Sequence, residues 1–371
     1  MDFKLLIKKL NNTLTEEEAI QFSEWYNDSQ AHKDYFKKVK TNYRNNLENI
    51  NTFKAWNAVE AKIDGTAKTT SFWKYRIAAS LILLIAFSFY FIVNKNTKVE
   101  HAISIGTDKA ILTLQDGSNI TLEKGEIFST EHMKSDGHEL VYDTDPMPIH
   151  PEIHYNYLTV PLGGQFIINL ADGTKVWLNS NSQLKYPESF AKGKPRAVEL
   201  VYGEAFFDVS PSSNHDGSNF IVKSSDQVIE VLGTQFNLKA YKEDTSITTT
   251  LVEGRITIGD EGVNSEILTP GEQSNFIKDS HALTKTIVPN VKFDIAWKNG
   301  YFMFDKQPLS EIMKTLSRWY NVRYEFTENA KEQIIFSGNL KKTQNIDNIL
   351  NYFAKTNEVD FDIENKTIII R

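Results

Sequence analysis

The chain has 371 residues, a formal net charge of −7 at pH 7 and no cysteine. Without cysteine the protein has no disulfide, no zinc–thiolate site and no thiol catalysis. The acidic excess lies beyond residue 94 and argues against an exterior that binds nucleic acid directly, because such exteriors are basic.

The first segment of the chain has the composition of a helical bundle. Residues 1–64 contain no Gly and no Pro, which favours helix throughout. Apolar residues recur at helical spacing, and short polar breaks separate four predicted helices. Thr15 followed by Glu16–Glu18 is a capping-box pattern, and Ser29 is expected to cap the third helix. We predict a small all-α domain over residues 1–72.

Aromatic residues are more numerous in this segment than so small a bundle needs for its core. One interpretation is that they simply form the core. The other is that some of them line a groove for the helices of a partner. On the second interpretation the candidate partner-binding residues are Phe22, Trp25, Tyr26, Tyr35, Phe36 and Trp56.

An uncharged apolar run over residues 77–93 (IAASLILLIAFSFYFIV) predicts one transmembrane helix, assigned to residues 73–95. As a helix the run covers roughly 26 Å of the ~30 Å hydrocarbon layer, and aromatic residues near its ends suit the headgroup level. The alternative is a buried core helix, but the run offers only two serines as a polar face. A removable secretion signal is not expected, because such a signal begins near residue 1.

Positive charge on either side of this run indicates its orientation. Five Lys and Arg residues lie between positions 54 and 76, and three lie between positions 94 and 116. We therefore expect a single-pass protein of the inner (cytoplasmic) membrane, in contact there with membrane lipid. Its N-terminal domain would lie in the cytoplasm and its C-terminus outside.

After residue 98 the pattern changes from helix to strand. Asp116-Gly117 and Asp172-Gly173 each stand between alternating runs, which is a strong hairpin signal. Many short strands at regular spacing predict a β-rich connector over 96–158 and an all-β domain over 159–285. The sequence leaves open whether these strands form a sandwich or a stacked, solenoid-like coil.

The last segment, residues 296–371, mixes strands and helices. We predict strands over 301–304, 323–326 and 335–340, helices over 309–320 and 346–356, and a closing hairpin over 359–363 and 367–370. This order predicts two βαβ-like units in tandem, with sheet edges available for strand addition. The predicted fold class is therefore multidomain: a small all-α cytoplasmic bundle, one transmembrane helix, an all-β domain and a C-terminal α+β domain.

Several stretches resemble the FecR family of membrane-spanning anti-sigma factors from Gram-negative bacteria. They are TVPLGGQFIINLADGTKVWLNSNSQLKYPESF (159–190), ELVYGEAFFDV (199–209), EVLGTQFNLKAY (230–241), LVEGRITI (251–258) and LTPGEQ (268–273). Residues 296–322 (AWKNGYFMFDKQPLSEIMKTLSRWYNV) resemble the extra C-terminal module of the Bacteroidetes branch. That module is similar to the short signalling domain at the start of secretins and TonB-dependent transducers.

The resemblance implies a mechanism and its partners. The cytoplasmic helices would hold an extracytoplasmic-function sigma factor. The periplasmic part would contact the signalling domain of a TonB-dependent outer-membrane transducer that has bound its ligand. An intramembrane or periplasmic protease would then free the sigma factor.

Some members of this family break their own chain at the motif seen here as Gly233-Thr234. A Thr hydroxyl could attack the preceding carbonyl, which makes these two residues the candidate self-cleavage site. The alternative is an uncleaved turn in which Gly supplies an unusual backbone conformation.

We predict no enzyme, no cofactor and no metal site. His150 and His154 offer two imidazoles but lack a third fixed ligand. A rival interpretation is a membrane-tethered periplasmic protein that binds glycan or cell-wall polymer without sigma control. Its support is the aromatic and Asn-rich stretch over residues 177–186.

Overall fold

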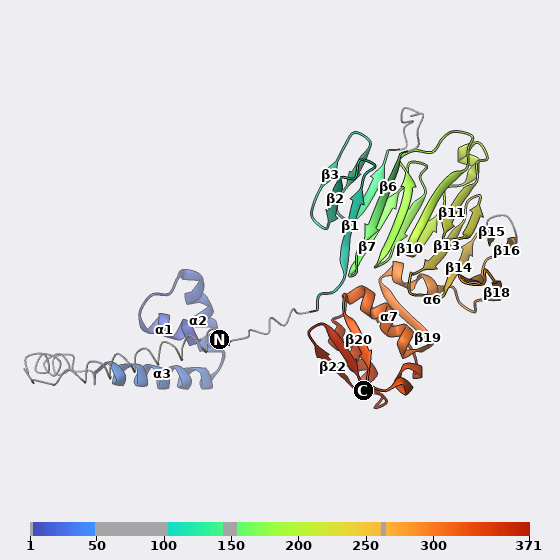
Figure 1. The fold of residues 1–371 in the computed structure, drawn as a ribbon. Coiled ribbons are helices and arrows are strands. Elements are labelled where there is room, and N and C mark those ends of the chain that lie inside the picture. Colours follow the sequence, from blue (N-terminus) through green and yellow to red (C-terminus); the bar gives the residue numbers. More distant parts are fainter. Residues whose placement is uncertain (1–2, 49–102, 144–153, 261–264) are drawn as a thin grey trace, which may run out of the picture. The chain divides into compact units, whose positions relative to one another are not determined.

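The computed structural model describes residues 3–48, 103–143, 154–260 and 265–371. The chain divides into two compact units, Met1–Asn96 and Thr97–Arg371. In the described residues the first unit contains only helices, and all strands belong to the second (Figure 1).

Three helices make up the described part of the first unit: α1 (Phe3–Leu10), α2 (Glu16–Asp28) and α3 (Gln30–Glu48). The predicted capping box is confirmed at the start of α2. The Thr15 hydroxyl accepts from the Glu18 N–H at 3.3 Å, and the Glu18 carboxylate accepts from the Thr15 N–H at 3.1 Å. The Ser29 hydroxyl accepts from the His32 N–H at 3.2 Å and so caps α3 as predicted. The predicted fourth helix falls outside the described residues.

One part of the predicted fold class is corrected: the transmembrane helix is not found among the described residues. No helix in the described ranges is long and apolar enough to cross a bilayer. α3 has 19 residues but carries charged side chains along its length, so it lacks the apolar surface that a span requires. Residues 73–95, over which the span is predicted, lie outside the described residues.

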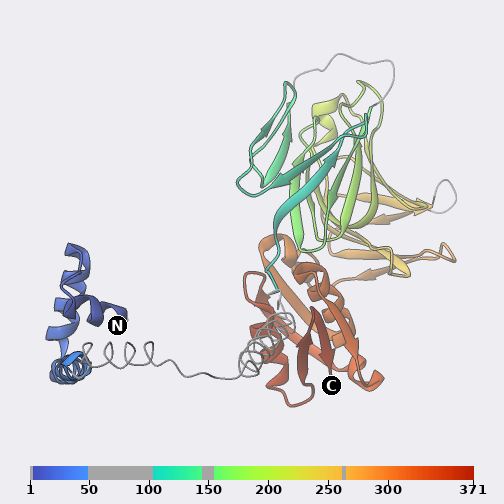
Figure 2. The ribbon, with the colours of Figure 1, turned by 60° about the vertical axis from the view of Figure 1, so that its left-hand side comes forward.

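The second unit begins with a β-sandwich of two facing sheets (Figures 1 and 2). In spatial order the first sheet contains β2 (Asn119–Glu123), β1 (Thr107–Thr113), β6 (Tyr155–Val160), β9 (Ser182–Pro187), the first half of β10 (Arg196–Asp208), β11 (Phe220–Ser224), β12 (Gln227–Val231), β15 (Ile256–Asp260) and β16 (Ser265–Leu268). The second sheet contains β3 (Phe128–Ser129), β4 (Met133–Ser135), β5 (Glu139–Tyr142), β7 (Gly164–Asn169), β8 (Lys175–Leu178), the second half of β10, β13 (Gln235–Ala240), β14 (Ser246–Glu253), β17 (Glu272–Ile277) and β18 (Leu283–Ile287). From β11 onward, successive hairpins lie alternately in the first and the second sheet.

β10 passes from the first sheet to the second and ties the two together. Its first half pairs with β9 and β11, and its second half pairs with β8 and β13. Gly203 lies at the change of sheet with φ +105°, and a Cβ there would lie 2.2 Å from the Ser182 Oγ. Only glycine suits both the conformation and the space at this corner.

One apolar core fills the space between the two sheets. Because side chains alternate along a strand, about every second residue of each strand points into this core. Leu112 of β1 and Leu122 of β2 belong to it, and Leu112 lies opposite Leu158 of β6 in the first sheet. Strands from the predicted connector over 96–158 are thus built into the sandwich itself.

A small α+β module follows the sandwich. Its elements are β19 (Tyr301–Pro308), α7 (Leu309–Tyr320), β20 (Arg323–Phe326), β21 (Ile335–Lys341), α8 (Ile346–Ala354), β22 (Phe361–Glu364) and β23 (Thr367–Ile370), and a short helix α6 (Lys292–Ile295) precedes them. The predicted tandem βαβ arrangement is wrong, because the strands on either side of α7 lie in different sheets. β19 pairs with β21, whereas β20 joins β23 and β22 in a second sheet. β23 is the central strand of that sheet because it pairs with β20 on one side and β22 on the other, and its Ile368 and Ile370 are buried.

Candidate functional site

The predicted aromatic residues of the helical unit lie together where α2 and α3 meet. The Phe22 ring is central, with its centroid 5.1 Å from that of Phe36 and 5.7 Å from that of Tyr26. Phe22 is 7% exposed, whereas Trp25, Tyr26 and Phe36 are half-buried. Phe22 therefore belongs to the core of the unit, and the other three rings serve both core and surface.

Tyr35 is exposed at 49% and extends this aromatic cluster onto the surface. Its ring meets that of Trp25 edge-on at 6.4 Å, and Trp25 stacks on His32 at 4.5 Å. Ile20 is exposed as well, at 61%. Exposed aromatic side chains held in place by neighbouring rings are typical anchors for a protein partner. Trp56, the sixth candidate, lies outside the described residues.

The Gly233-Thr234 motif forms the turn between β12 and β13. Gly233 has φ +144°, and a Cβ there would lie 2.9 Å from the Pro211 Cα, so the turn needs glycine. The Thr234 hydroxyl is buried and donates to the Arg255 carbonyl at 3.0 Å. That hydrogen bond directs the hydroxyl proton to a backbone carbonyl, which is not a base that could accept it. The geometry assigns both residues a structural role in the turn.

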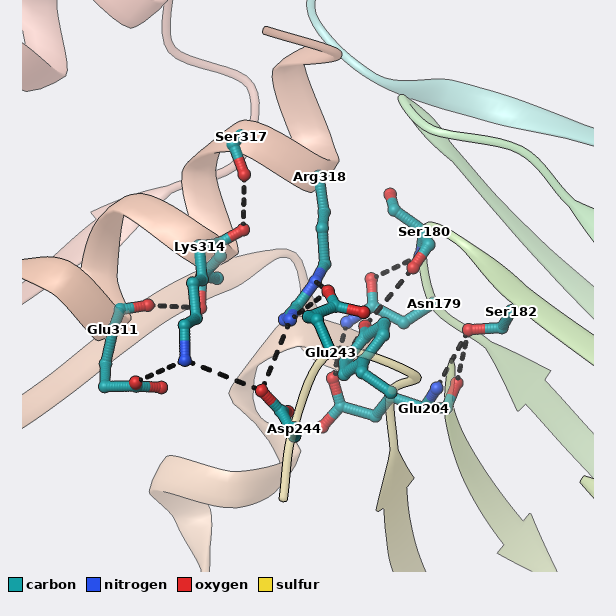
Figure 3. A network of polar contacts seen from close by, with 12 residues as sticks. Asn179, Ser180, Ser182, Glu204, Glu243, Asp244, Glu311, Lys314, Ser317 and Arg318 are labelled. Atoms are coloured by element: carbon teal, nitrogen blue, oxygen red, sulfur yellow. Dashed lines mark hydrogen bonds and ion pairs between the residues drawn. The ribbon is translucent and has the colours of Figure 1, made fainter. Parts of the chain in front are cut away.

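A polar network joins α7 of the module to the sandwich (Figure 3). The Arg318 guanidinium donates to the Glu243 carboxylate from Nε at 3.1 Å and from Nη2 at 2.7 Å, and it lies over the Tyr241 ring. One turn earlier on α7, the Lys314 ammonium pairs with Asp244 at 3.6 Å. Sequence reasoning missed this network because Arg318 and Glu243 are 75 positions apart, and the resemblance over 296–322 does not say what Arg318 contacts.

Glu204 of β10 is the acidic centre on the sandwich side of this boundary. Its carboxylate accepts from Asn237 Nδ2 at 2.9 Å, from Asn179 Nδ2 at 2.8 Å and from the Tyr241 hydroxyl at 3.4 Å. Burial, followed by the charge of Glu204, raises the pKa of Asp294 to about 6. Glu204, Tyr241 and Asp294 help to line a cavity of about 290 Å³ between the sandwich and the module.

Lys342 makes a second contact between the module and the sandwich. It is 3% exposed, and its Nζ donates to the Gln165 side chain of β7 at 2.8 Å. The ammonium also lies 3.7 Å from the centroid of the Trp319 ring. Burial lowers the pKa of Lys342 to about 7. A buried lysine of this kind has no signature in the sequence, because its environment is assembled from distant strands and helices.

The aromatic stretch that supported glycan binding is used inside the fold. Tyr186 is fully buried, and its hydroxyl lies 3.1 Å from that of Tyr142. Trp177 packs edge-on against Phe206 at 5.7 Å and is covered by the Lys298 ammonium at 4.4 Å. An aromatic face covered in this way is not free to stack on a sugar ring.

The two parts of the second unit define the class of protein: a two-sheet β domain with an α+β module appended. Family models agree with this division. One described as "FecR protein" matches residues 157–257, and one described as "FecR, C-terminal" matches residues 301–370. No curated protein matches the chain.

Two crystal structures of a candidate anti-sigma factor from Parabacteroides distasonis ATCC 8503 are similar to this chain. Each is 27% identical in sequence, and the match covers 58% of this chain and 98% of the crystallised chain. The TM-scores are 0.52 and 0.51. The second unit therefore carries the domains of the FecR family.

Proposed function

We propose that this protein is an anti-sigma factor. Its helical unit would bind and sequester an extracytoplasmic-function sigma factor, and its FecR unit would govern the release. The observation that carries the proposal is the pair of FecR matches on adjacent parts of the chain, together with the similarity to a candidate anti-sigma factor of known structure. The proposed activity is regulated binding and not catalysis.

The aromatic surface of α2 and α3 supports the helical unit as the binding part. Tyr35 is aromatic and Ile20 is apolar, yet both side chains are exposed. The Tyr35 ring contacts the Trp25 ring edge-on. Large rings anchored in this way supply most of the binding free energy in many protein interfaces. We expect Tyr35 to insert between helices of the sigma factor, with Trp25 at the edge of the contact.

The release step is proposed from the family resemblance. The second unit would contact the signalling domain of a TonB-dependent transducer in its ligand-bound state, and an intramembrane or periplasmic protease would then free the sigma factor. Location in the inner membrane stays a prediction, and reporter fusions at the two ends of the chain measure it.

Capture of a sigma factor by the full chain tests the central step. The tagged full-length protein is co-expressed with each extracytoplasmic-function sigma factor of its source organism, and the bound material is identified by mass spectrometry. We expect one sigma factor to co-purify. Recovery of none of them would contradict the proposal.

A matched pair of variants on α3 locates the binding surface. Tyr35→Ala should raise the dissociation constant roughly tenfold or more if Tyr35 is an anchor. Lys40→Ala, at an exposed position on another face of the same helix, should leave it within about twofold. Circular dichroism of both variants verifies that the helical unit is intact. Equal affinities for the two variants would remove Tyr35 from the proposed surface.

A further inference from the structure

The segment that leads into the sandwich packs against the C-terminal module. Residues 103–106, named here the lead-in segment, come directly before β1 and connect it to residues 49–102. Ile103 and Ile105 are half-buried against the apolar core of the module, which is separate from the core of the sandwich. The module, at the far end of the sequence, thus packs against the residues that come directly before β1.

Trp319 near the end of α7 makes the closest contact with the lead-in segment. A Cβ on Gly106 would lie 2.5 Å from the Trp319 Cδ2, so the indole lies directly on the backbone. The following residue, Thr107, donates its N–H to the Gly163 carbonyl at 3.0 Å, and the Gly163 N–H donates to the Arg318 carbonyl at 2.7 Å. The end of α7 therefore holds the lead-in segment and the turn before β7 together.

The module and the sandwich are joined by polar and charged groups as well as by these apolar contacts. Arg318, which lines the cavity of about 290 Å³, pairs with Glu243, and Lys342 donates to Gln165. The two apolar cores are distinct clusters and share no residue. Separation of the module would therefore return these polar and charged groups to water and expose Ile103 and Ile105, but would leave the sandwich core closed.

We propose that the module and the lead-in segment form a clasp. Docking of the module on the sandwich covers Ile103, Ile105 and Gly106, and undocking uncovers them. A partner that binds the module at the expense of its contacts with the sandwich opens the clasp and exposes an extended apolar stretch. The regulatory meaning of the clasp rests on the proposed function, whereas its opening and closing involve no sigma factor.

Thiol labelling of the full chain tests the clasp directly. The chain has no cysteine, so one introduced cysteine reports on one position. The thiol of Ile105→Cys should react slowly with a maleimide while the clasp is closed, because labelling requires local opening. Arg318→Glu in the same chain places a like charge against Glu243 and should raise this rate roughly tenfold or more. Ser104→Cys, at an exposed position, should react fast with either residue at 318.

A reporter inside the sandwich separates undocking from unfolding. Leu112 is fully buried in the sandwich core, and the thiol of Leu112→Cys should stay unreactive when Arg318→Glu is present. Equal acceleration at positions 105 and 112 would mean that the whole unit unfolds, and it would overturn the clasp. A labelling rate at position 105 that is the same with and without Arg318→Glu would overturn the clasp as well.

A glycine pair tests the clasp without changing any charge. The methyl group of Gly106→Ala would overlap the Trp319 ring, so we expect it to raise the labelling rate of Ile105→Cys roughly tenfold. Gly338→Ala is the matched control in the module, because a Cβ there meets no atom within 4 Å. Equal labelling rates in the two variants would overturn the proposal. Failure of the clasp would leave sigma-factor capture intact, and failure of capture would leave the labelling rates intact, so the two proposals fail separately.

Discussion

The guanidinium carbon of Arg318 lies 3.5 Å from the centroid of the Tyr241 ring, while Nη2 of the same group donates to Glu243 at 2.7 Å. Arg318 belongs to α7 of the module, and the other two residues follow β13 of the sandwich. One side chain thus makes a cation–π contact and an ion pair across the same boundary. Arg318 is only 6% exposed, so its guanidinium is shielded from water in both contacts.

Replacement of Arg318 by methionine should weaken this boundary. Arg318→Met keeps most of the side-chain volume but loses the ion pair and the cation–π contact, so we expect a free energy of unfolding lower by about 1–3 kcal/mol. Urea denaturation of the second unit in the full chain measures the change. Arg323→Met, at an exposed position on β20, is the control and should change it by less than about 0.5 kcal/mol. Similar losses in the two variants would contradict a special role for Arg318.

The stability of the second unit should depend on pH through Lys342. Burial lowers the pKa of Lys342 to about 7 from its ordinary value of 10.5, although Glu204 and Asp108 act in the opposite direction. Between these two values the unfolded chain binds more protons than the folded chain, so stability rises with pH. The contribution of Lys342 should therefore increase from about pH 7.5 to about pH 9.5 and be lost as the pH falls towards 7.

A comparison with Lys342→Met isolates this contribution from that of other groups. Methionine replaces the side chain with an apolar one of similar length that cannot titrate. The difference in urea midpoint between the wild type and Lys342→Met should change in favour of the wild type as the pH rises. Parallel pH profiles for the two proteins would show that Lys342 does not titrate in this range.

Gly203 should tolerate no side chain. Its φ of +105° disfavours any L-residue, and a Cβ would overlap Ser182 on the neighbouring strand β9. We expect Gly203→Ala to lower the free energy of unfolding by roughly 2 kcal/mol or more. Thermal denaturation against Gly338→Ala, which has room for a methyl group, provides the measurement and its control. A melting temperature equal to that of the control would disprove the corner role of Gly203.

Thr234 should be needed for stability and not for chain cleavage. Its hydroxyl donates to the Arg255 carbonyl, so Thr234→Ala removes a partly buried hydrogen bond and should lower the free energy of unfolding by about 0.5–1.5 kcal/mol. A denaturing gel of the purified wild type should show one full-length band, as should the variant. Two fragments that meet at the Gly233–Thr234 bond, present in the wild type and absent from the variant, would instead establish self-cleavage.

Local patterns were a good guide to individual elements. The capping box at Thr15, the cap at Ser29 and the bounds of α7 are as expected. The turns at Asp116-Gly117 and Asp172-Gly173 join β1 to β2 and β7 to β8. These features depend on a few neighbouring residues, whose side chains and backbone conformations express the same preferences in any fold.

The site was predictable only in part. Composition indicated the aromatic cluster of the helical unit, but only the structure separates buried Phe22 from exposed Tyr35. The boundary residues Arg318 and Lys342 gave no signal, because their partners lie far away in the sequence. The βαβ expectation failed for the same reason: periodicity locates a strand but does not select its neighbour.

Short-range physics thus accounts for many of the helices, strands and turns of this chain, and family motifs in those elements mark residues 157–257 and 301–370 as FecR domains. Long-range contacts determine the tertiary structure. They join the two facing sheets through β10, pair β20 of the module with the distant β23, and place the lead-in segment against Trp319. Strand pairing and the burial of charge arise only when remote residues meet, so no window of neighbouring residues contains them.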